Sequence, residues 1–186
     1  YPREAGNPQS SITLLATKAW VYPKFQVNGA RIIAPLDILD LTMTQIGEYQ
    51  RVGYDYIITA LKKKYKTLSD PNKGLSYTVL EPPLQALNMI YPHTDINKSK
   101  EKDLYMYLYG KRGLDRVMRY DESTMSDFRY EDKTIQNFGK IFAPDNIGRY
   151  SAKIANICNS IANSKGIVFV YSQYIAGGAV PIALSL

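Results

Sequence analysis

The sequence predicts an α/β protein, and three observations near its C-terminal end carry that prediction. Residues 149–166 contain an apolar i, i+3, i+4, i+7 stripe from Ile154 to Ile161, which is typical of an amphipathic helix. GIVFVY follows as an unbroken β-branched and aromatic run, which predicts a strand buried on both faces. Two glycines and Pro181 then begin a second helix. This order indicates the start of a doubly wound layer with its other strands missing, so we expect a truncated fold.

The sequence signals for the elements before this layer are less regular, except for one helix. ITLLA and ARIIA, within residues 11–36, predict two short strands. The stretch LTMTQIGEYQRVGYDYIITALKKKYKT changes to a helical period. Thr42 and Gln45 have the spacing of a capping box, and Lys62 to Lys64 suit the negative end of the helix dipole. This helix is the most secure element of the sequence.

The middle of the chain predicts short and irregular structure. Between residues 69 and 94, Pro82, Pro83 and Pro92 argue against long regular elements and leave a short helical turn over LQALNMI. Residues 98–119 predict a helix broken near the two glycines of GKRG. The polar stretch that follows predicts a short strand over residues 128–130.

The amino-acid composition excludes several classes of protein. The 186 residues include one cysteine and one histidine, so neither a disulfide framework nor a zinc cluster is expected. No stretch approaches the ~20 apolar residues of a membrane span, and YPREAGNPQS shows neither an initiating methionine nor a leader. We therefore expect a soluble, intracellular, metal-independent chain whose natural start is missing. The net charge of +6 favours an anionic partner such as DNA or RNA.

One candidate site lies at the end of the predicted strand. Ser172, Gln173 and Gly177 would follow that strand where a helix N-terminus directs free N–H groups toward anions. These residues could contact a phosphate of a nucleotide or of a nucleic-acid strand. The alternative is a plain turn in which the glycines only relieve strain.

A second candidate site is the basic run over residues 98–119. Lys111 and Arg112 lie close to three alternate tyrosines, so the run could combine phosphate attraction with base stacking. The alternative is that the tyrosines pack inward while the basic side chains remain solvated. His93 follows a proline and has no plausible nucleophile partner, and Cys158 lies on an apolar stripe as a small hydrophobe.

Motifs for complete catalytic sites are absent from the sequence. It has no G-x-x-x-x-G-K-[ST] phosphate loop, no G-x-G-x-x-G dinucleotide turn and no G-x-S-x-G nucleophile elbow. No catalytic residue is therefore assigned within the chain.

FGKIFAPDNIGRYSAKIANICNSIANSKGIVFVYSQYIAGGAVPIALSL, residues 138–186, resembles the superfamily-two helicases of large nucleocytoplasmic DNA viruses, related to poxvirus early-transcription helicases. In this resemblance GIVFVYSQYI matches the fourth helicase motif, and YGKRGL and LTMTQIGEYQ fit more loosely. The resemblance implies an ATP-dependent helicase with two RecA-like lobes. Its ATP and Mg²⁺ sites would lie before Tyr1 and beyond Leu186, and Ser172, Gln173 and Gly177 would meet the phosphates of the tracking strand.

The resemblance also implies a partial RecA-like fold in three parts. Residues 1–40 would end the first lobe, residues 41–147 would form a helical and irregular interlobe segment, and residues 148–186 would begin the second lobe. Viral transcription machinery becomes a possible partner, and the virion or the host cytoplasm a possible location. Two alternatives stay open: a noncatalytic, transcription-associated binding subunit with a helicase-like lobe, and a complete basic α/β binding protein.

Overall fold

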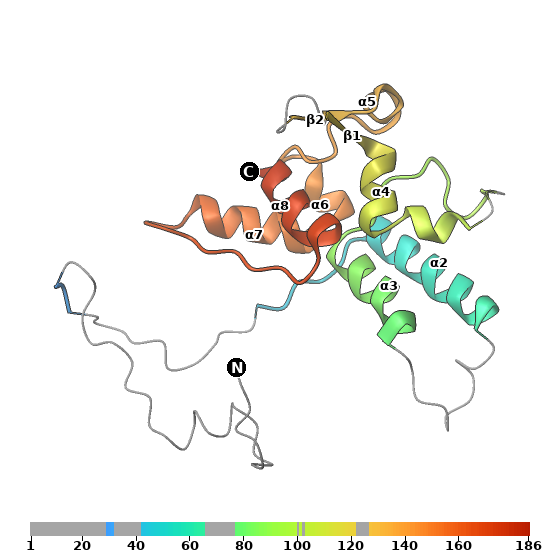
Figure 1. Cartoon of the computed structure of the whole chain (residues 1–186), viewed down its shortest axis with the longest axis horizontal. Helices are drawn as coiled ribbons and strands as arrows, with labels where there is room; N and C mark the ends of the chain where they lie inside the picture. Colours follow the sequence, from blue (N-terminus) through green and yellow to red (C-terminus); the bar gives the residue numbers. More distant parts are fainter. Residues whose placement is uncertain (1–28, 32–41, 66–76, 100, 102, 122–126) are drawn as a thin grey trace, which may run out of the picture. The chain divides into compact units, whose positions relative to one another are not determined.

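A computed structural model of the chain describes residues 29–31, 42–65, 77–99, 101, 103–121 and 127–186 (Figure 1). The chain divides into two compact units, Tyr1–Thr42 and Met43–Leu186. Apart from residues 29–31, the strands expected within residues 11–36 and the first-lobe segment 1–40 lie outside the described residues. The elements below all belong to the second unit, which includes both residues 43–147 and residues 148–186.

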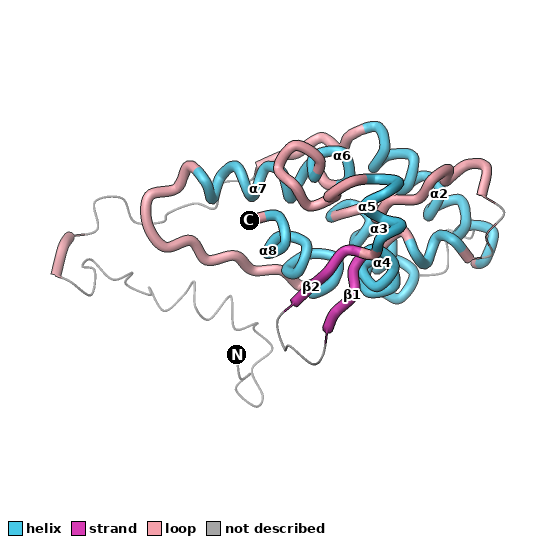
Figure 2. The backbone as a smooth tube through the Cα atoms, turned by 90° about the horizontal axis from the view of Figure 1, so that it is seen from above, coloured by secondary structure: helices cyan, strands magenta, loops and turns pink. Residues whose placement is uncertain are grey.

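The second unit is mainly helical and carries one small sheet. Its elements are α2 (Glu48–Lys64), α3 (Tyr77–Asn88), the 3-10 helix η2 (Leu104–Tyr107), α4 (Gly110–Val117), β1 (Met118–Asp121), β2 (Asp127–Tyr130), α5 (Asp132–Phe138), α6 (Ile147–Tyr150), α7 (Ala152–Ala162), the π-helix η3 (Ile175–Ala179) and α8 (Val180–Ser185). β1 and β2 form an antiparallel pair, drawn as two neighbouring strands in Figure 2. The mixture of helix and strand is compatible with an α/β class. Within the described ranges, no helix has the length and apolarity needed to cross a membrane.

The helix expected after residue 41 is confirmed as α2, but its predicted start is wrong. Residues 42–47 are not helical, and Gly47 precedes the helix without a side-chain capping bond. The Thr42 and Gln45 capping box therefore does not form. Lys62 to Lys64 occupy the last turn as predicted, where their charge opposes the helix dipole.

The expectation that prolines would prevent a long helix before residue 90 is also wrong. α3 runs from Tyr77 to Asn88 with Pro82 and Pro83 inside it, and each proline removes one helix donor. Pro82 and Ala86 are buried on one face of α3, and α3 packs against α2. Burial of this face compensates for the missing helix hydrogen bonds.

The basic run follows the sequence prediction only in part: a break is present, but it lies before the two glycines of GKRG, which both belong to α4, and the strand β1 was not predicted. The run forms η2 and α4, separated at residues 108–109, and Gly110 begins α4 with a φ of +59° that favours glycine. The strand expected over residues 128–130 is confirmed as β2. In its pairing with β1, Met118 lies opposite Tyr130, and Tyr120 lies opposite Phe128.

The last long helix and its cap are confirmed. Ser151 precedes α7, and its Oγ accepts a hydrogen bond from the Ile154 N–H at 2.9 Å. The same hydroxyl donates to the Asn88 carbonyl at 2.5 Å. This one side chain therefore begins α7 and joins it to the C-terminal end of α3.

The strand expected over residues 166–171 is not formed in the structure. The segment is extended, but its backbone pairs with no strand among the described residues, which contain only the sheet of β1 and β2. Ile167, Phe169 and Tyr171 are 104%, 88% and 81% exposed, whereas Val168 and Val170 are 42% and 39% exposed. The prediction of burial on both faces is therefore wrong for this structure, because no neighbouring strand covers the segment.

The core consists of two clusters of buried side chains that meet at an extended segment after α3. Met89 and Tyr91 belong to the first cluster, together with residues of α4, α6, α7 and α8. Ile90 belongs to the second cluster, which includes Ile57 of α2 and Leu104 of η2. Alternate side chains of an extended chain point to opposite sides, so this segment serves both clusters.

Gln50 is a fully buried polar residue of α2 that joins three elements. Its Nε2 donates to the carbonyls of Ala86 and Leu87, at 3.1 and 3.0 Å, near the end of α3. Its Oε1 accepts from the N–H of Ala152, the first residue of α7, at 3.3 Å. The amide thereby satisfies helix-end groups that have no partner within their own helices.

Replacement of Gln50 by leucine should lower the free energy of unfolding by about 2–3 kcal/mol, because it leaves buried backbone groups without partners. Urea denaturation would measure this change. Gln136→Leu, at an exposed position of α5, is the matched control and should change stability by less than about 0.5 kcal/mol. Equal denaturation midpoints for the two variants would contradict the role assigned to Gln50.

Candidate nucleic-acid interface

A cavity of about 900 Å³ lies between α3, α4, the hairpin and the turn that leads into α8. Its volume is within the range of about 300–1,000 Å³ typical of ligand sites. It is lined by Glu81, Gln85, Lys111, Leu114, Asp115, Met118, Arg119, Tyr120, Phe128, Gln173, Tyr174, Ile175, Ala176 and Val180. The cavity brings together two segments that the sequence singled out separately, the basic run and the turn after residue 171.

Some charged groups of this cavity form ion pairs or hydrogen bonds with other described residues, and others do not. Arg119 Nε lies 3.1 Å from Glu131 Oε1, so its charge is partly balanced within the hairpin region. Glu81 Oε1 accepts a hydrogen bond from Gln85 Nε2 at 3.0 Å. Lys111 has no ion-pair partner within the described part of the chain. Lys111 is therefore the cation of this cavity that is most available to a ligand anion.

Aromatic side chains form the hairpin side of the cavity. The rings of Tyr120 and Phe128 lie opposite each other across the two strands, with centroids 5.1 Å apart and planes inclined by 51°. Tyr120 is 50% exposed. Exposed aromatic faces next to a cation match the requirements of a single nucleic-acid strand, whose bases stack while its phosphates are neutralised.

The turn before α8 is held by its own polar side chains. Ser172 Oγ donates to the Tyr174 carbonyl at 2.8 Å and accepts from the Tyr174 N–H at 3.2 Å. Gln173 Nε2 donates to the Tyr77 hydroxyl at 2.8 Å. The hydroxyls of Tyr77 and Tyr174 lie 3.4 Å apart, and this hydrogen bond is the main cause that raises the pKa of Tyr174 to about 12. Ser172 thus has a structural role in closing the turn.

Gly177 is explained by close packing. A Cβ at Gly177 would lie 2.7 Å from Oε1 of Gln85, and so would a Cβ at Gly110. Both glycines therefore leave room for the same amide side chain, which itself lines the cavity. Gly177 is not among the described glycines with a positive φ, so relief of backbone strain, the alternative expected from the sequence, does not explain this position.

A buried tyrosine fixes the turn to the core. Tyr91 is fully buried, and its hydroxyl donates to the Ala176 carbonyl at 2.5 Å. Burial raises the pKa of Tyr91, so the phenol keeps its proton over the whole range in which the protein would be studied. Gly113 of α4 packs directly against the ring. The position of the cavity wall at Ala176 therefore depends on Tyr91.

The structure brings together some of the predicted site residues and separates others. Lys111 and Gln173 line the same cavity, and Gly177 lies beside it through Gln85. Ser172 lines a different cavity, next to α7. Arg112 does not line the cavity, and its Nη1 lies 3.3 Å from the sulfur of Met106. Because α4 is a helix, the neighbouring residues Lys111 and Arg112 direct their side chains to different surroundings.

Sequence reasoning missed the hairpin side of this cavity. Tyr120 and Phe128 were not selected as site residues, because the region around them shows no steady period, and Arg119 was included only as the last residue of the basic run. A signal is present in RYDESTMSDFRY, where two Arg-Tyr pairs flank a polar stretch, as expected for two strands and their connection.

Comparisons with known proteins identify no relative: no family model, no curated protein and no solved structure matches the chain. The sequence has no phosphate loop, and the described ranges contain no group of three or more His, Cys, Asp or Glu side chains that could hold a metal ion.

Tyr91→Phe should lower the free energy of unfolding by about 1 kcal/mol, because the buried Ala176 carbonyl loses its donor. Urea denaturation would measure the loss, and amide exchange should accelerate over residues 172–179 more than in α2. Tyr171→Phe, at an exposed phenol, is the control and should leave both measurements unchanged. Unchanged exchange in the turn of Tyr91→Phe would show that Tyr91 does not hold it.

Proposed function

We propose that this chain binds single-stranded nucleic acid, as a segment of an ATP-dependent helicase or translocase of viral type. The observation that carries the binding part is the 900 Å³ cavity, in which Lys111 and Arg119 lie beside the Tyr120 and Phe128 rings. The helicase part is supported by the sequence resemblance of residues 138–186.

Two kinds of interaction would bind the strand in the cavity: charge neutralisation of its phosphates and stacking of its bases. Lys111 would neutralise a phosphate, since its ammonium has no ion pair within the described ranges. Tyr120, together with Phe128, would present an aromatic face to a base. Glu81 and Asp115 line the same cavity and would repel phosphates, so the backbone of the strand is expected on the Lys111 and Arg119 side. Neither interaction reads base identity, and both DNA and RNA fit.

The exposed segment 166–171 supports placing residues 148–186 at the start of a RecA-like lobe. Ile167, Phe169 and Tyr171 present an apolar face that a central sheet strand would bury. In the proposed protein, other segments would supply the neighbouring strands, and ATP with Mg²⁺ would be held by residues outside this chain. Ser172, Gln173 and Gly177 would then lie at the strand's carboxyl end, with Ser172 and Gly177 shaping the turn.

A second candidate function is a noncatalytic nucleic-acid-binding subunit, associated with viral transcription machinery. This candidate shares the binding surface with the first and differs only in the absence of ATP turnover from the whole protein.

Lys111→Gln and Arg112→Gln form a matched pair for the binding test, since each removes one charge from α4. Affinity for a fluorescent single-stranded oligonucleotide would be measured by anisotropy over a range of salt concentrations. Lys111→Gln should weaken binding and reduce the slope of log affinity against log salt by about 0.7, the value for one lost phosphate contact. Arg112→Gln should change the slope less, because Arg112 does not line the cavity. Equal effects would mean that general charge, rather than this cavity, binds the strand.

The isolated chain should hydrolyse no ATP, with or without nucleic acid, because it contains no phosphate loop. A phosphate-release assay on the purified chain, with oligonucleotide present, would measure this. Turnover stimulated by nucleic acid would contradict the placement of the ATP site outside these residues.

A further inference from the structure

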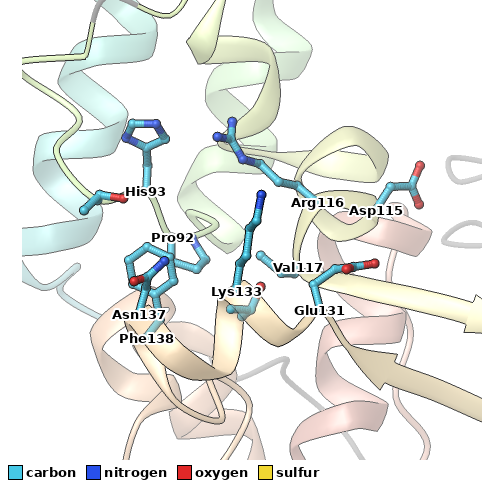
Figure 3. A pocket seen from close by; sticks show the side chains of 11 residues that line it. Pro92, His93, Asp115, Arg116, Val117, Glu131, Lys133, Asn137 and Phe138 are labelled. Carbon is cyan, nitrogen blue, oxygen red and sulfur yellow. The ribbon is translucent and has the colours of Figure 1, made fainter.

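A second cavity, of about 430 Å³, lies on another part of the molecule (Figure 3). Three segments contribute to it: the loop after α3, the second half of α4, and the region from β2 through α5. It is lined by Pro92, His93, Thr94, Asp115, Arg116, Val117, Glu131, Lys133, Thr134, Asn137 and Phe138. The proposed binding function uses neither this cavity nor its histidine.

Three basic side chains, one from each of these segments, face this cavity. Figure 3 shows His93 and the Arg116 guanidinium on one side, with the Lys133 side chain extending toward them from α5. The Asp115 and Glu131 carboxylates lie apart from this group, on the hairpin side of the view. Glu131 is also engaged with Arg119, at 3.1 Å. The basic groups therefore converge, while the two acidic residues that line the cavity point elsewhere.

Glu101 holds two of these groups in place. Arg116 donates to both oxygens of Glu101, at 3.0 and 3.1 Å, and this interaction is the main cause that lowers the pKa of that carboxyl. His93 Nε2 lies 3.3 Å from Glu101 Oε2. The Asp95 N–H donates to His93 Nδ1 at 3.3 Å, so Nε2 carries the hydrogen of the neutral ring. Both side chains are thus oriented before any ligand arrives.

The basic side chains of this cavity retain hydrogen-bond donors that could bind another anion. A guanidinium has five N–H donors, and the contact with Glu101 uses two of them, so Arg116 retains three. Lys133 has no ion-pair partner within the described ranges. Arg116 and Lys133 bring two positive charges to this cavity. Glu101 balances one of them, Glu131 is paired with Arg119, and the remaining carboxylate of the lining, Asp115, lies apart from the two cations in Figure 3. Thr94 and Asn137 add neutral hydrogen-bonding groups to the lining.

We propose that this cavity binds a phosphomonoester, with Arg116 and Lys133 contacting the phosphate and His93 at its edge. A phosphate accepts several hydrogen bonds at once, which suits a fixed guanidinium fork beside an ammonium. A cavity of 430 Å³ leaves room beyond the phosphate for an attached sugar. Two sources carry this chemistry: a free mononucleotide and the terminal phosphate of a nucleic-acid strand.

The single histidine makes the test direct, because the imidazole resonance of His93 needs no assignment. The full chain would be titrated by proton NMR at constant pH with inorganic phosphate, with AMP, and with a short oligonucleotide that does or does not carry a 5′-phosphate. We expect a saturable shift of the His93 resonance with inorganic phosphate and with AMP or the phosphorylated oligonucleotide. Whichever of these two binds more tightly identifies the source.

Lys133→Gln should weaken the phosphate titration about tenfold or more, as expected for loss of a charge-assisted contact. Lys140→Gln, at an exposed lysine that does not line the cavity, removes the same charge and should leave the titration unchanged. A non-saturating shift, or equal weakening in both variants, would overturn the proposal. So would an equal shift with the unphosphorylated oligonucleotide, since that strand offers only phosphodiesters. Lys111→Gln should weaken oligonucleotide binding but not the titration with inorganic phosphate, because Lys111 does not line this cavity, so failure of one site does not imply failure of the other.

Discussion

The described unit depends on the extended segment Met89–Tyr91, which lies between the two core clusters and hydrogen-bonds to both sides. Ile90 N–H donates to the Tyr150 carbonyl at 3.0 Å, and Tyr91 N–H donates to the Leu108 carbonyl at 2.8 Å. Its side chains alternate between the clusters, so a slip of one residue would move every one of them to the wrong cluster. One short segment therefore fixes the relative placement of the helices before and after it.

Both cavities take their geometry from this segment. The Tyr91 hydroxyl holds the turn at Ala176, which forms one wall of the larger cavity. Pro92 and His93 follow immediately and line the smaller one. The His93 N–H donates to the Tyr49 hydroxyl at 2.8 Å, which ties the loop to α2. Hydrogen bonds of the Tyr91 and Tyr49 hydroxyls thus hold segments that line both cavities.

Local signals predicted α2, α7, α8 and the strand β2, but not the full α3 or α5, and nonlocal packing explains the failures. Ser151 was recognisable as a cap because its partner is three residues away. α3 was missed because the burial of Pro82 against neighbouring elements is not visible in a local pattern. The strand over residues 166–171 has the right composition, yet a strand also needs a neighbour. Lys111 was selected from charge alone, but the hairpin wall beside it depends on long-range pairing that periodicity does not report.

The contacts of Gln85 with Gly110 and Gly177 limit which substitutions these positions can accept during evolution. Gly110 has a φ of +59°, so backbone conformation restricts that position whatever residue occupies position 85. Gly177 has no such conformational requirement, and a Cβ there would require only the end of the Gln85 side chain to shift. A smaller residue at position 85 would release position 177 but not position 110. Among homologous sequences, positions 85 and 177 should therefore covary in side-chain size, while position 110 stays glycine independently of both.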